Sequence, residues 1–236
     1  MITNAQIKYI RSLREKKFRE ASGEFVVEGE KMVKEALQSG FQLVGVWRLE
    51  DIGENAMSRI SQLSSPSPVL AVLKIPRSGS LPQKFERGLY LALDSVRDPG
   101  NLGTIIRIAD WFGVGTVFAS PDCVDTYNPK VVQASMGSVF RVKVMTADIP
   151  QVCAKFREEG MDVYGTVLDG ADIYKEQFVP EGLVVMGNES VGISPQVRGL
   201  LTRRLLIPSF GSAGAESLNV AVATAVTLSE FRRRSL

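Results

Sequence analysis

The chain has 236 residues, of which 44% are hydrophobic and 23% charged, as in ordinary globular proteins of one large or two modest domains. It contains no histidine, which excludes Ser-His-Asp catalysis, Cys-His catalysis and zinc hydrolase chemistry. Cys123 and Cys153 form no CxxC pair and no disulfide framework. No apolar run reaches the ~18 residues that a membrane span requires, and residues 1–6 lack the pattern of a secretory signal. We therefore expect a cytoplasmic protein that does not enter a membrane.

The net charge of +2 is unevenly distributed along the chain. Residues 1–20 hold six basic and two acidic side chains, a balance of +4, so the remainder carries −2. Ile7, Ile10 and Leu13 recur at helical spacing, which predicts one short basic amphipathic helix over residues 4–20. Such a helix is either a solvated surface or a nucleic-acid contact. We expect an RNA-binding surface made of Lys8, Arg11, Arg14, Lys16 and Lys17.

A small α/β domain is predicted to follow. Short β-branched runs and helical patterns alternate there, giving strands at 25–29, 43–49 and 69–75 and helices at 30–39 and 56–63. Residues 76–82 are too rich in Pro, Gly and Ser for a regular element, so we place a domain boundary there. The predicted domains are residues 1–80 and residues 88–236.

Strands and helices mostly alternate in the second domain. The strands are expected at 89–93, 116–119, 142–145, 162–168, 183–186 and 205–207, and the helices at 102–112, 129–136, 149–159, 195–201 and 218–233. Alternation of this kind predicts an α/β fold with a mostly parallel sheet covered on both faces. Ligands of such sheets bind beyond the carboxyl ends of the strands.

Three polar segments follow strands of this sheet. Asn101 stands after a Pro-Gly turn, where a helix N-cap is expected, and Arg107 lies six residues further among isoleucines, which usually demands a partner for the charge. Glu189 closely follows the strand at 183–186, and Ser217 is placed as the N-cap of the last helix. Taken singly, each segment is a weak signal, because each can also be interpreted as an ordinary helix start. Neither GxGxxG nor GxxxxGK[ST] occurs at the first turn, which argues against NAD and ATP.

Taken in order, the segments resemble the three motifs of the SpoU/TrmH (SPOUT-class) RNA ribose methyltransferases. The matching residues are Asn101-Leu102-Gly103 with Arg107, Gly187-Asn188-Glu189-x-x-Gly192, and Ile207-Pro208 with Ser217 to Ala223. The resemblance covers residues 88–233. The first domain, with Phe25-Val26-Val27-Glu28-Gly29, is similar to the substrate-binding domain of many rRNA-directed members, a fold akin to a ribosomal protein.

The resemblance implies a C-terminal trefoil knot formed by residues 166–219, S-adenosylmethionine bound within it, no metal, and a homodimer formed across it. By motif position, the cofactor site would be lined by Thr166, Leu168, Gly187, Ile207 and Leu218. The polar residues around the ribose would be Asn101, Arg107, Glu189, Ser217 and Asn219. The chain between Ile207 and Ser217 is longer than the family pattern, so residues 209–215 are given no cofactor contact.

The implied reaction is methyl transfer to a ribose 2′-hydroxyl, with 23S-type ribosomal RNA as the expected substrate. The enzyme must hold the oxygen in line with an already activated methyl group and help it lose a proton. Because a guanidinium is a poor base, we expect Arg107 to bind a neighbouring phosphate and stabilise developing alkoxide, held in place by Glu189 and Asn101, while water or phosphate takes the proton. Two alternatives stay open: a tRNA methyltransferase acting on a ribose or a base nitrogen, and a non-catalytic RNA-binding ribosome-assembly protein.

Overall fold

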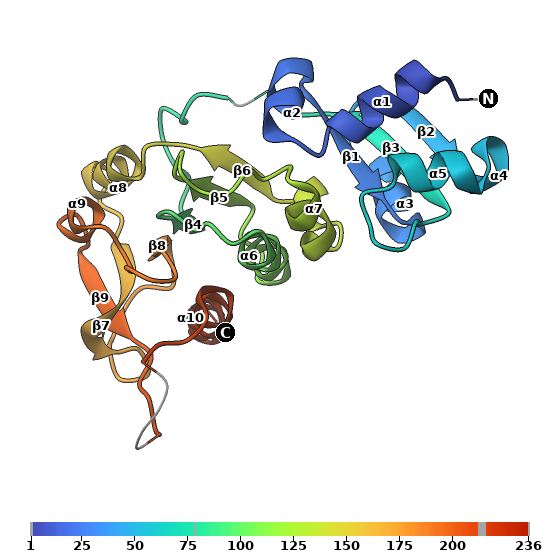
Figure 1. Ribbon diagram of the computed structural model, residues 1–236. Helices are drawn as coiled ribbons and strands as arrows, with labels where there is room; N and C mark the ends of the chain where they lie inside the picture. Colours follow the sequence, from blue (N-terminus) through green and yellow to red (C-terminus); the bar gives the residue numbers. More distant parts are fainter. Residues whose placement is uncertain (1, 78, 212–215, 236) are drawn as a thin grey trace.

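The structure is a computed structural model that describes residues 2–77, 79–211 and 216–235. Figure 1 shows two bodies side by side, each built around its own sheet. A three-stranded sheet lies in the N-terminal part and a six-stranded sheet in the C-terminal part. Residues 76–77 and 79–88, where we place the domain boundary, form neither helix nor strand. Among the described residues, no helix is both long and apolar enough to span a membrane.

The single helix expected over residues 4–20 is wrong, because two helices stand in its place, α1 (Asn4–Ser12) and α2 (Lys16–Ser22). The apolar positions of α1 are buried as expected. The break has a physical reason in Arg19, whose side chain is 2% exposed. Its guanidinium donates to two backbone carbonyl oxygens in the break, at 2.8 and 2.7 Å, which a continuous helix would have used internally.

The N-terminal sheet is antiparallel in the order β1-β3-β2. Its strands are β1 (Glu24–Glu28), β2 (Leu43–Arg48) and β3 (Val69–Lys74). Buried residues of α3 (Glu30–Gln38) pack on one face. Buried residues of α1 and α5 (Glu54–Ile60) pack on the other face, and a short α4 (Leu49–Ile52) precedes α5. The three predicted strands are confirmed to within one residue at each end.

The C-terminal sheet has the order β6-β5-β4-β8-β7-β9, and all its pairings are parallel. Its strands are β4 (Leu89–Leu93), β5 (Thr116–Ala119), β6 (Lys143–Thr146), β7 (Val163–Asp172), β8 (Gly182–Met186) and β9 (Arg203–Leu206). The predicted α/β fold with a mostly parallel sheet is therefore confirmed. The chain leaves β4 toward β5 on one side and returns to pair β8 on the other, so a switch point lies at the carboxyl end of β4.

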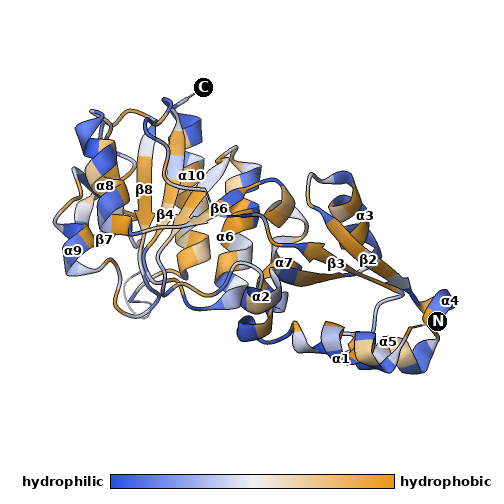
Figure 2. Ribbon diagram, turned by 90° about the horizontal axis from the view of Figure 1, so that it is seen from above, coloured by the Kyte–Doolittle hydropathy of each residue, from blue (hydrophilic) through white to orange (hydrophobic). Residues whose placement is uncertain are grey.

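Helices cover both faces of this sheet, as the alternating pattern predicted. One face is covered by α6 (Pro99–Trp111), α7 (Pro129–Ser135) and α10 (Val220–Arg233), and the other by α8 (Ile149–Glu158) and α9 (Pro195–Arg198). A 3-10 turn, η1 (Ser138–Phe140), follows α7. Figure 2 shows the apolar strands β4 and β8 enclosed between these layers. Strand β8 is buried along its whole length, as parallel strands covered on both sides are.

The two bodies share side-chain contacts that fix one against the other. Val132 and Val139 of the C-terminal part belong to the same apolar cluster as the N-terminal sheet. The rings of Phe25 and Tyr127 lie 4.6 Å apart across the junction. Arg19 donates from Nε and Nη2 to a carboxylate oxygen of Asp125, at 2.8 and 2.5 Å. An ion pair whose arginine is buried, with two donors on one carboxylate oxygen inside an apolar junction, leaves little freedom for a hinge.

We expect Asp125→Ala to destabilise the whole chain, because it leaves the Arg19 guanidinium buried with two of its donors unpaired. Removing one partner of a buried pair costs about 3 kcal/mol. Urea unfolding measures the change. Lys17→Ala is the matched control, since its pair with Glu15 at 3.0 Å is exposed and such pairs contribute at most about 1 kcal/mol. Equal losses in the two variants would contradict the structural role assigned to Arg19.

Candidate functional site

The loop between β4 and α6 places Asn101 differently from the sequence prediction. Helix α6 begins at Pro99, and its N-cap is Asp98, whose carboxylate accepts from the backbone N–H of Asn101 at 2.8 Å. A capping Asp followed by Pro is a strong helix start. The expected N-cap role of Asn101 is therefore wrong. The Asn101 side chain lies in the first turn of α6 and is free to bond with other loops.

A chain of three polar side chains links the loops after β4 and β8 to the start of α10. The Asn219 amide nitrogen donates to the Asn101 side-chain oxygen at 2.9 Å. The Asn101 amide nitrogen in turn donates to a Glu189 carboxylate oxygen at 3.0 Å. Three of the five residues expected around the ribose therefore meet at one edge of the sheet, beside the switch point. The three come from segments that span 118 positions of chain from Asn101 to Asn219, with 88 of them between Asn101 and Glu189.

The Glu189 carboxylate is stabilised in its ionised form. Backbone N–H groups of Arg97 and Asp98 point to its two oxygens at 3.4 and 3.3 Å, in addition to the bond from Asn101. Partial burial raises the pKa of Glu189, but the hydrogen bonds from Asn101 and from backbone N–H groups outweigh it and hold that pKa below the ordinary 4.5. Glu189 is therefore an acceptor that orients its neighbours, with a permanent negative charge at neutral pH.

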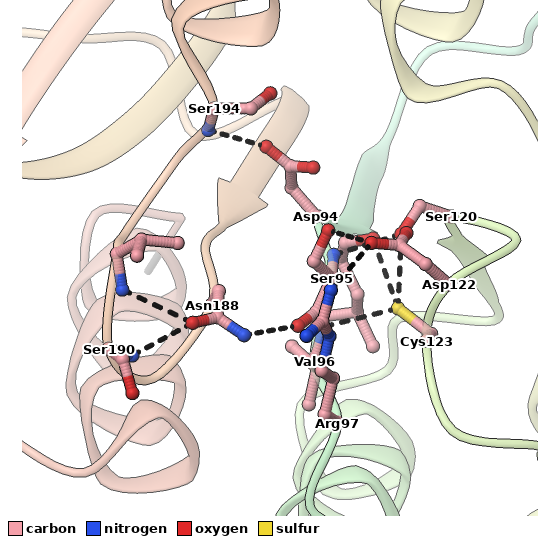
Figure 3. A network of polar contacts seen from close by, with 12 residues as sticks. Asp94, Ser95, Val96, Arg97, Ser120, Asp122, Cys123, Asn188, Ser190 and Ser194 are labelled. Atoms are coloured by element: carbon pink, nitrogen blue, oxygen red, sulfur yellow. Dashed lines mark hydrogen bonds and ion pairs between the residues drawn. The ribbon is translucent and has the colours of Figure 1, made fainter.

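The loop carrying Glu189 is held closed by its own backbone. Asn188 and Gly192 exchange two backbone hydrogen bonds of 3.0 Å, and the Asn188 side chain donates to the Ser95 carbonyl oxygen at 2.7 Å. A Cβ on Gly187 would lie 2.2 Å from the carbonyl carbon of Gly192. Only glycine leaves room for this close backbone approach. Figure 3 shows Asn188 reaching from this loop to the segment after β4.

A second network, which the sequence did not reveal, holds the segment after β4. Ser95 has a positive φ of 65°, a conformation that is uncommon for residues other than glycine. Its backbone N–H donates to the Ser120 hydroxyl at 2.9 Å, and its own hydroxyl donates to Asp122. Hydrogen bonds from Ser120 and from Ser95 lower the pKa of Asp122. Cys123 accepts from the backbone N–H of Val96, and burial raises the pKa of its thiol (Figure 3).

Asp94, at the end of β4, is a further residue that sequence reasoning missed. It is 6% exposed and accepts from the backbone N–H of Ser194 at 2.7 Å, across to the loop that leads into α9. The sequence signal for Asp94 is its position as a charged residue directly after a buried strand. The bond fixes the far end of the Glu189 loop to β4, so both ends of that loop are tied to the same strand.

Two of the expected ribose residues are not part of this cluster. Arg107 is exposed, and within the described residues it makes no hydrogen bond or ion pair, so the expectation that Glu189 and Asn101 hold it is wrong. Its isoleucine neighbours at 105 and 106 face the core, which turns Arg107 to the outer side of α6. Ser217 is exposed and is not the N-cap of α10. That N-cap is Asn219, whose side-chain oxygen accepts from two backbone N–H groups of the first turn.

Two family models match parts of this chain. Residues 88–229 match the model of the SpoU rRNA Methylase family, and residues 4–54 match the MRM3-like substrate binding domain.

The chain belongs to the SpoU rRNA methylase family.

Relatives of known activity and known structure cover almost the whole chain. The 23S rRNA (guanosine(2553)-2'-O)-methyltransferase RlmP of Bacillus subtilis is 30% identical over 97% of this chain and 96% of its own. A TrmH-family protein from Porphyromonas gingivalis superimposes with a TM-score of 0.88 at 40% identity, covering 99% of both chains. An AdoMet-bound rRNA methyltransferase from Sinorhizobium meliloti gives 0.87 at 32% identity, covering 100% of this chain and 97% of that one. The expected family membership is confirmed.

The residues that the SpoU resemblance assigns to the cofactor follow neighbouring strands. Gly187 comes after β8, Thr166 and Leu168 lie in β7, and Ile207 comes after β9, in a sheet whose strands are about 5 Å apart. The pairing of β7 with β9 shifts register between residues 166 and 171. Leu168 lies in this shift and is 73% exposed, and Leu218 is also exposed. Exposed apolar side chains of this kind fit a ligand with apolar parts. Of the longer loop after Ile207, residues 212–215 lie outside the described residues.

The SpoU domain shows no candidate metal centre in the part of the chain that the structure describes: no three His, Cys, Asp or Glu side chains gather there in a way that could hold an ion.

The lowered pKa of Glu189 predicts how the stability of the protein against urea depends on pH. Because the folded pKa lies below 4.5, the stabilisation from its ionised form is complete above the unfolded pKa and is lost as pH falls through the folded pKa. Glu189→Gln should unfold at lower urea concentration than wild type at pH 7, and the difference should shrink as the pH falls through the unfolded pKa and then the folded pKa. Glu158→Gln, at an exposed position of α8, should show no such pH-dependent gap. A gap that persists at low pH would contradict the assignment.

Proposed function

We propose that this protein transfers a methyl group from S-adenosylmethionine to a ribose 2′-hydroxyl of ribosomal RNA. The observation that carries the proposal is the Asn219–Asn101–Glu189 chain at the carboxyl edge of the sheet, in a member of the SpoU family. Two relatives support the substrate: the B. subtilis enzyme, and a 23S rRNA (uridine(2479)-2'-O)-methyltransferase of Streptomyces viridochromogenes, 28% identical over 92% of this chain and 85% of its own.

S-adenosylmethionine supplies an activated methyl group when it is bound. Gly187, whose lack of a side chain lets Gly192 close the loop, would shape the backbone beside the cofactor, while Thr166, Leu168, Ile207 and Leu218 would contact its apolar and adenosine parts. The AdoMet-bound neighbours of similar fold support this assignment. The order of the strands places four of these five residues along one edge of the sheet, next to the polar chain that ends in Asn219.

We assign separate roles to Asn101 and Arg107 at the ribose. Asn101 is fixed at both ends, because its oxygen accepts from Asn219 and its nitrogen donates to Glu189. Its fixed position orients the start of α6, and Arg107 follows about 9 Å further along the same helix. The exposed guanidinium of Arg107 has its donors available for a phosphate and for the developing charge on the 2′-oxygen. The proton then passes to water or phosphate.

RNA recognition is proposed to use the N-terminal domain, residues 1–80, ahead of a catalytic domain of residues 88–236. The match of residues 4–54 to a substrate-binding domain supports this division. The basic side chains Lys8, Arg11, Lys16 and Lys17 are exposed, while Arg14 donates to the Ser61 carbonyl oxygen and so has one donor occupied. A ribosomal RNA substrate also supports a cytoplasmic location.

We further propose that the catalytic domain contains a C-terminal trefoil knot and forms a homodimer across it. Solved TrmH and SpoU neighbours of the same fold support the knot. Exposed apolar residues near the carboxyl edge support the dimer, since isolated chains seldom leave such groups uncovered together. They are Leu168, Val191, Phe210, Leu218 and Val222.

A methyl-transfer assay with purified protein, labelled S-adenosylmethionine and 23S rRNA transcript tests the proposed function. Wild type should label ribose 2′-oxygens, and Arg107→Ala should reduce the rate by about 10²- to 10³-fold, as removal of one charge-stabilising donor does. Cofactor affinity, measured by calorimetry, should stay unchanged. Arg157→Ala, at an exposed position of α8, is the matched control and should keep the full rate.

Other outcomes decide between the alternatives. Labelling of tRNA in place of rRNA, or of a base nitrogen, would overturn the proposed substrate. Cofactor binding without transfer to any cellular RNA would favour a non-catalytic RNA-binding protein. A normal rate for the Arg107 variant would remove that guanidinium from the mechanism.

The dimer is tested by light scattering in solution. Val222 is exposed on α10, three residues beyond Asn219, so Val222→Arg should convert a species of twice the chain mass into a monomer by placing a charge in an apolar interface. Trp111→Ser is the control, because this exposed Trp lies at the opposite end of α6 from Asn101. Wild type that is monomeric, or a Val222 variant that stays dimeric, would contradict the proposed interface.

A further inference from the structure

A groove runs between the two bodies of the molecule, on the side of β6. Its volume is about 710 Å³, and residues of both bodies line it. Strand β6 is the edge of the large sheet, so its outer backbone N–H and C=O groups pair with no other strand. The opposite wall is formed by α2 and by residues 75–77 of the connecting segment. None of the five residues assigned to the cofactor lines this groove.

The lining of the groove is basic. Five basic side chains and two acidic ones face it. Three of the basic groups already have carboxylate partners: Arg19 with Asp125, Arg141 with Asp110 and Glu35, and Lys16 with Glu20. Arg77 and Lys143 are exposed, and neither forms an ion pair within the described residues. These two cations border the groove from different bodies, Lys143 also bordering a second cavity with Met145, and their charge is available for a ligand.

The groove reaches the catalytic edge of the sheet. Ser120, which lines it, accepts from the backbone N–H of Ser95 at 2.9 Å, and Ser95 also binds Asn188 of the Glu189 loop through its carbonyl oxygen. The carboxyl ends of β5 and β6 lie about 5 and 10 Å from that of β4. A stacked strand of nucleic acid rises about 3.4 Å per nucleotide. The groove thus begins within two or three nucleotides of a ribose placed at Asn101.

The walls of the groove are rigid relative to each other. The buried Arg19–Asp125 pair and the shared apolar cluster join the two bodies beside it. A preformed site of this kind loses less entropy on binding than one that must close. Lys and Arg side chains, backbone N–H groups and hydroxyls are the groups that contact nucleic-acid phosphates without reading sequence. The groove supplies all three, with a charge excess that suits an extended polyanion.

We propose that this groove holds the single-stranded RNA segment next to the target nucleotide, with Arg77 and Lys143 binding backbone phosphates. The inference rests on the proposed RNA methyltransferase function and adds a defined path for the strand. The groove contacts the phosphates flanking the target, while the exposed cations of α1 contact more distant parts of the RNA.

Fluorescence anisotropy with a fluorescein-labelled single-stranded RNA of about 12 nucleotides tests the inference, since single-strand sites span about 4 to 16 nucleotides. The double variant Arg77→Ala/Lys143→Ala should bind about five- to tenfold more weakly. The slope of log affinity against log salt should fall by about 1.4, since each lost contact to a single strand removes about 0.7. The variant should unfold at the same temperature as wild type, because both side chains are exposed.

Lys31→Ala/Lys34→Ala is the matched control, because it removes two exposed cations of α3 that do not line the groove. Equal affinity of the two double variants for the labelled RNA would overturn the inference. In the methyl-transfer assay, the groove variant should raise KM for rRNA and keep kcat. If the wild-type enzyme transfers methyl groups and the groove variant has an unchanged KM, the proposed RNA contact in the groove is contradicted, while the proposed reaction stands. A wild-type protein without transfer whose groove variant still loses RNA affinity would refute only the proposed reaction.

Discussion

The site depends on the adjacency of β4 and β8, whose parallel pairing brings two distant loops to one edge. The register pairs Leu93 with Met186, so the chain segments that follow both strands emerge side by side. Three hydrogen-bonded ties then join them: Asn188 to Ser95, Ser194 to Asp94, and Asn101 to Glu189. Each tie satisfies a polar group that would otherwise lie unpaired at the rim of a buried strand. The third tie is also the one that places the polar groups proposed to surround the ribose.

Sequence reasoning was most reliable where a single physical signal acted. Apolar runs located β4 and β5 to the residue, because strands covered on both faces have no competing use for such side chains. It failed at helix starts, where two capping residues compete. Asp98 takes the position expected for Asn101, and Asn219 takes that expected for Ser217. In each case, two residues of good capping propensity stand within three positions, and the loop's tertiary bonds decide between them.

Other features carried almost no local signal. The positive φ of Ser95 and its bonds to Ser120 and Asp122 depend on β5 lying beside β4, which no window of sequence states. Arg19 looked like one more cation of a basic helix, yet it is buried and pairs with a residue 106 positions away. For Arg107 the opposite holds. Its apolar neighbours in the sequence suggest a buried charge with a partner, but the helical repeat turns its side chain outward. The residues of the site could be found from motifs, but their bonding partners could not.

The contacts between the two bodies affect which RNA molecules can reach both of them at once. The Arg19–Asp125 pair and the Phe25–Tyr127 contact set the distance between the N-terminal surface and Asn101 in this structure. Under the proposed function, an RNA that reaches both the N-terminal surface and Asn101 must present its ribose at that distance. A change of the surface residues would then alter which RNA fits, while the distance itself stays set by the junction.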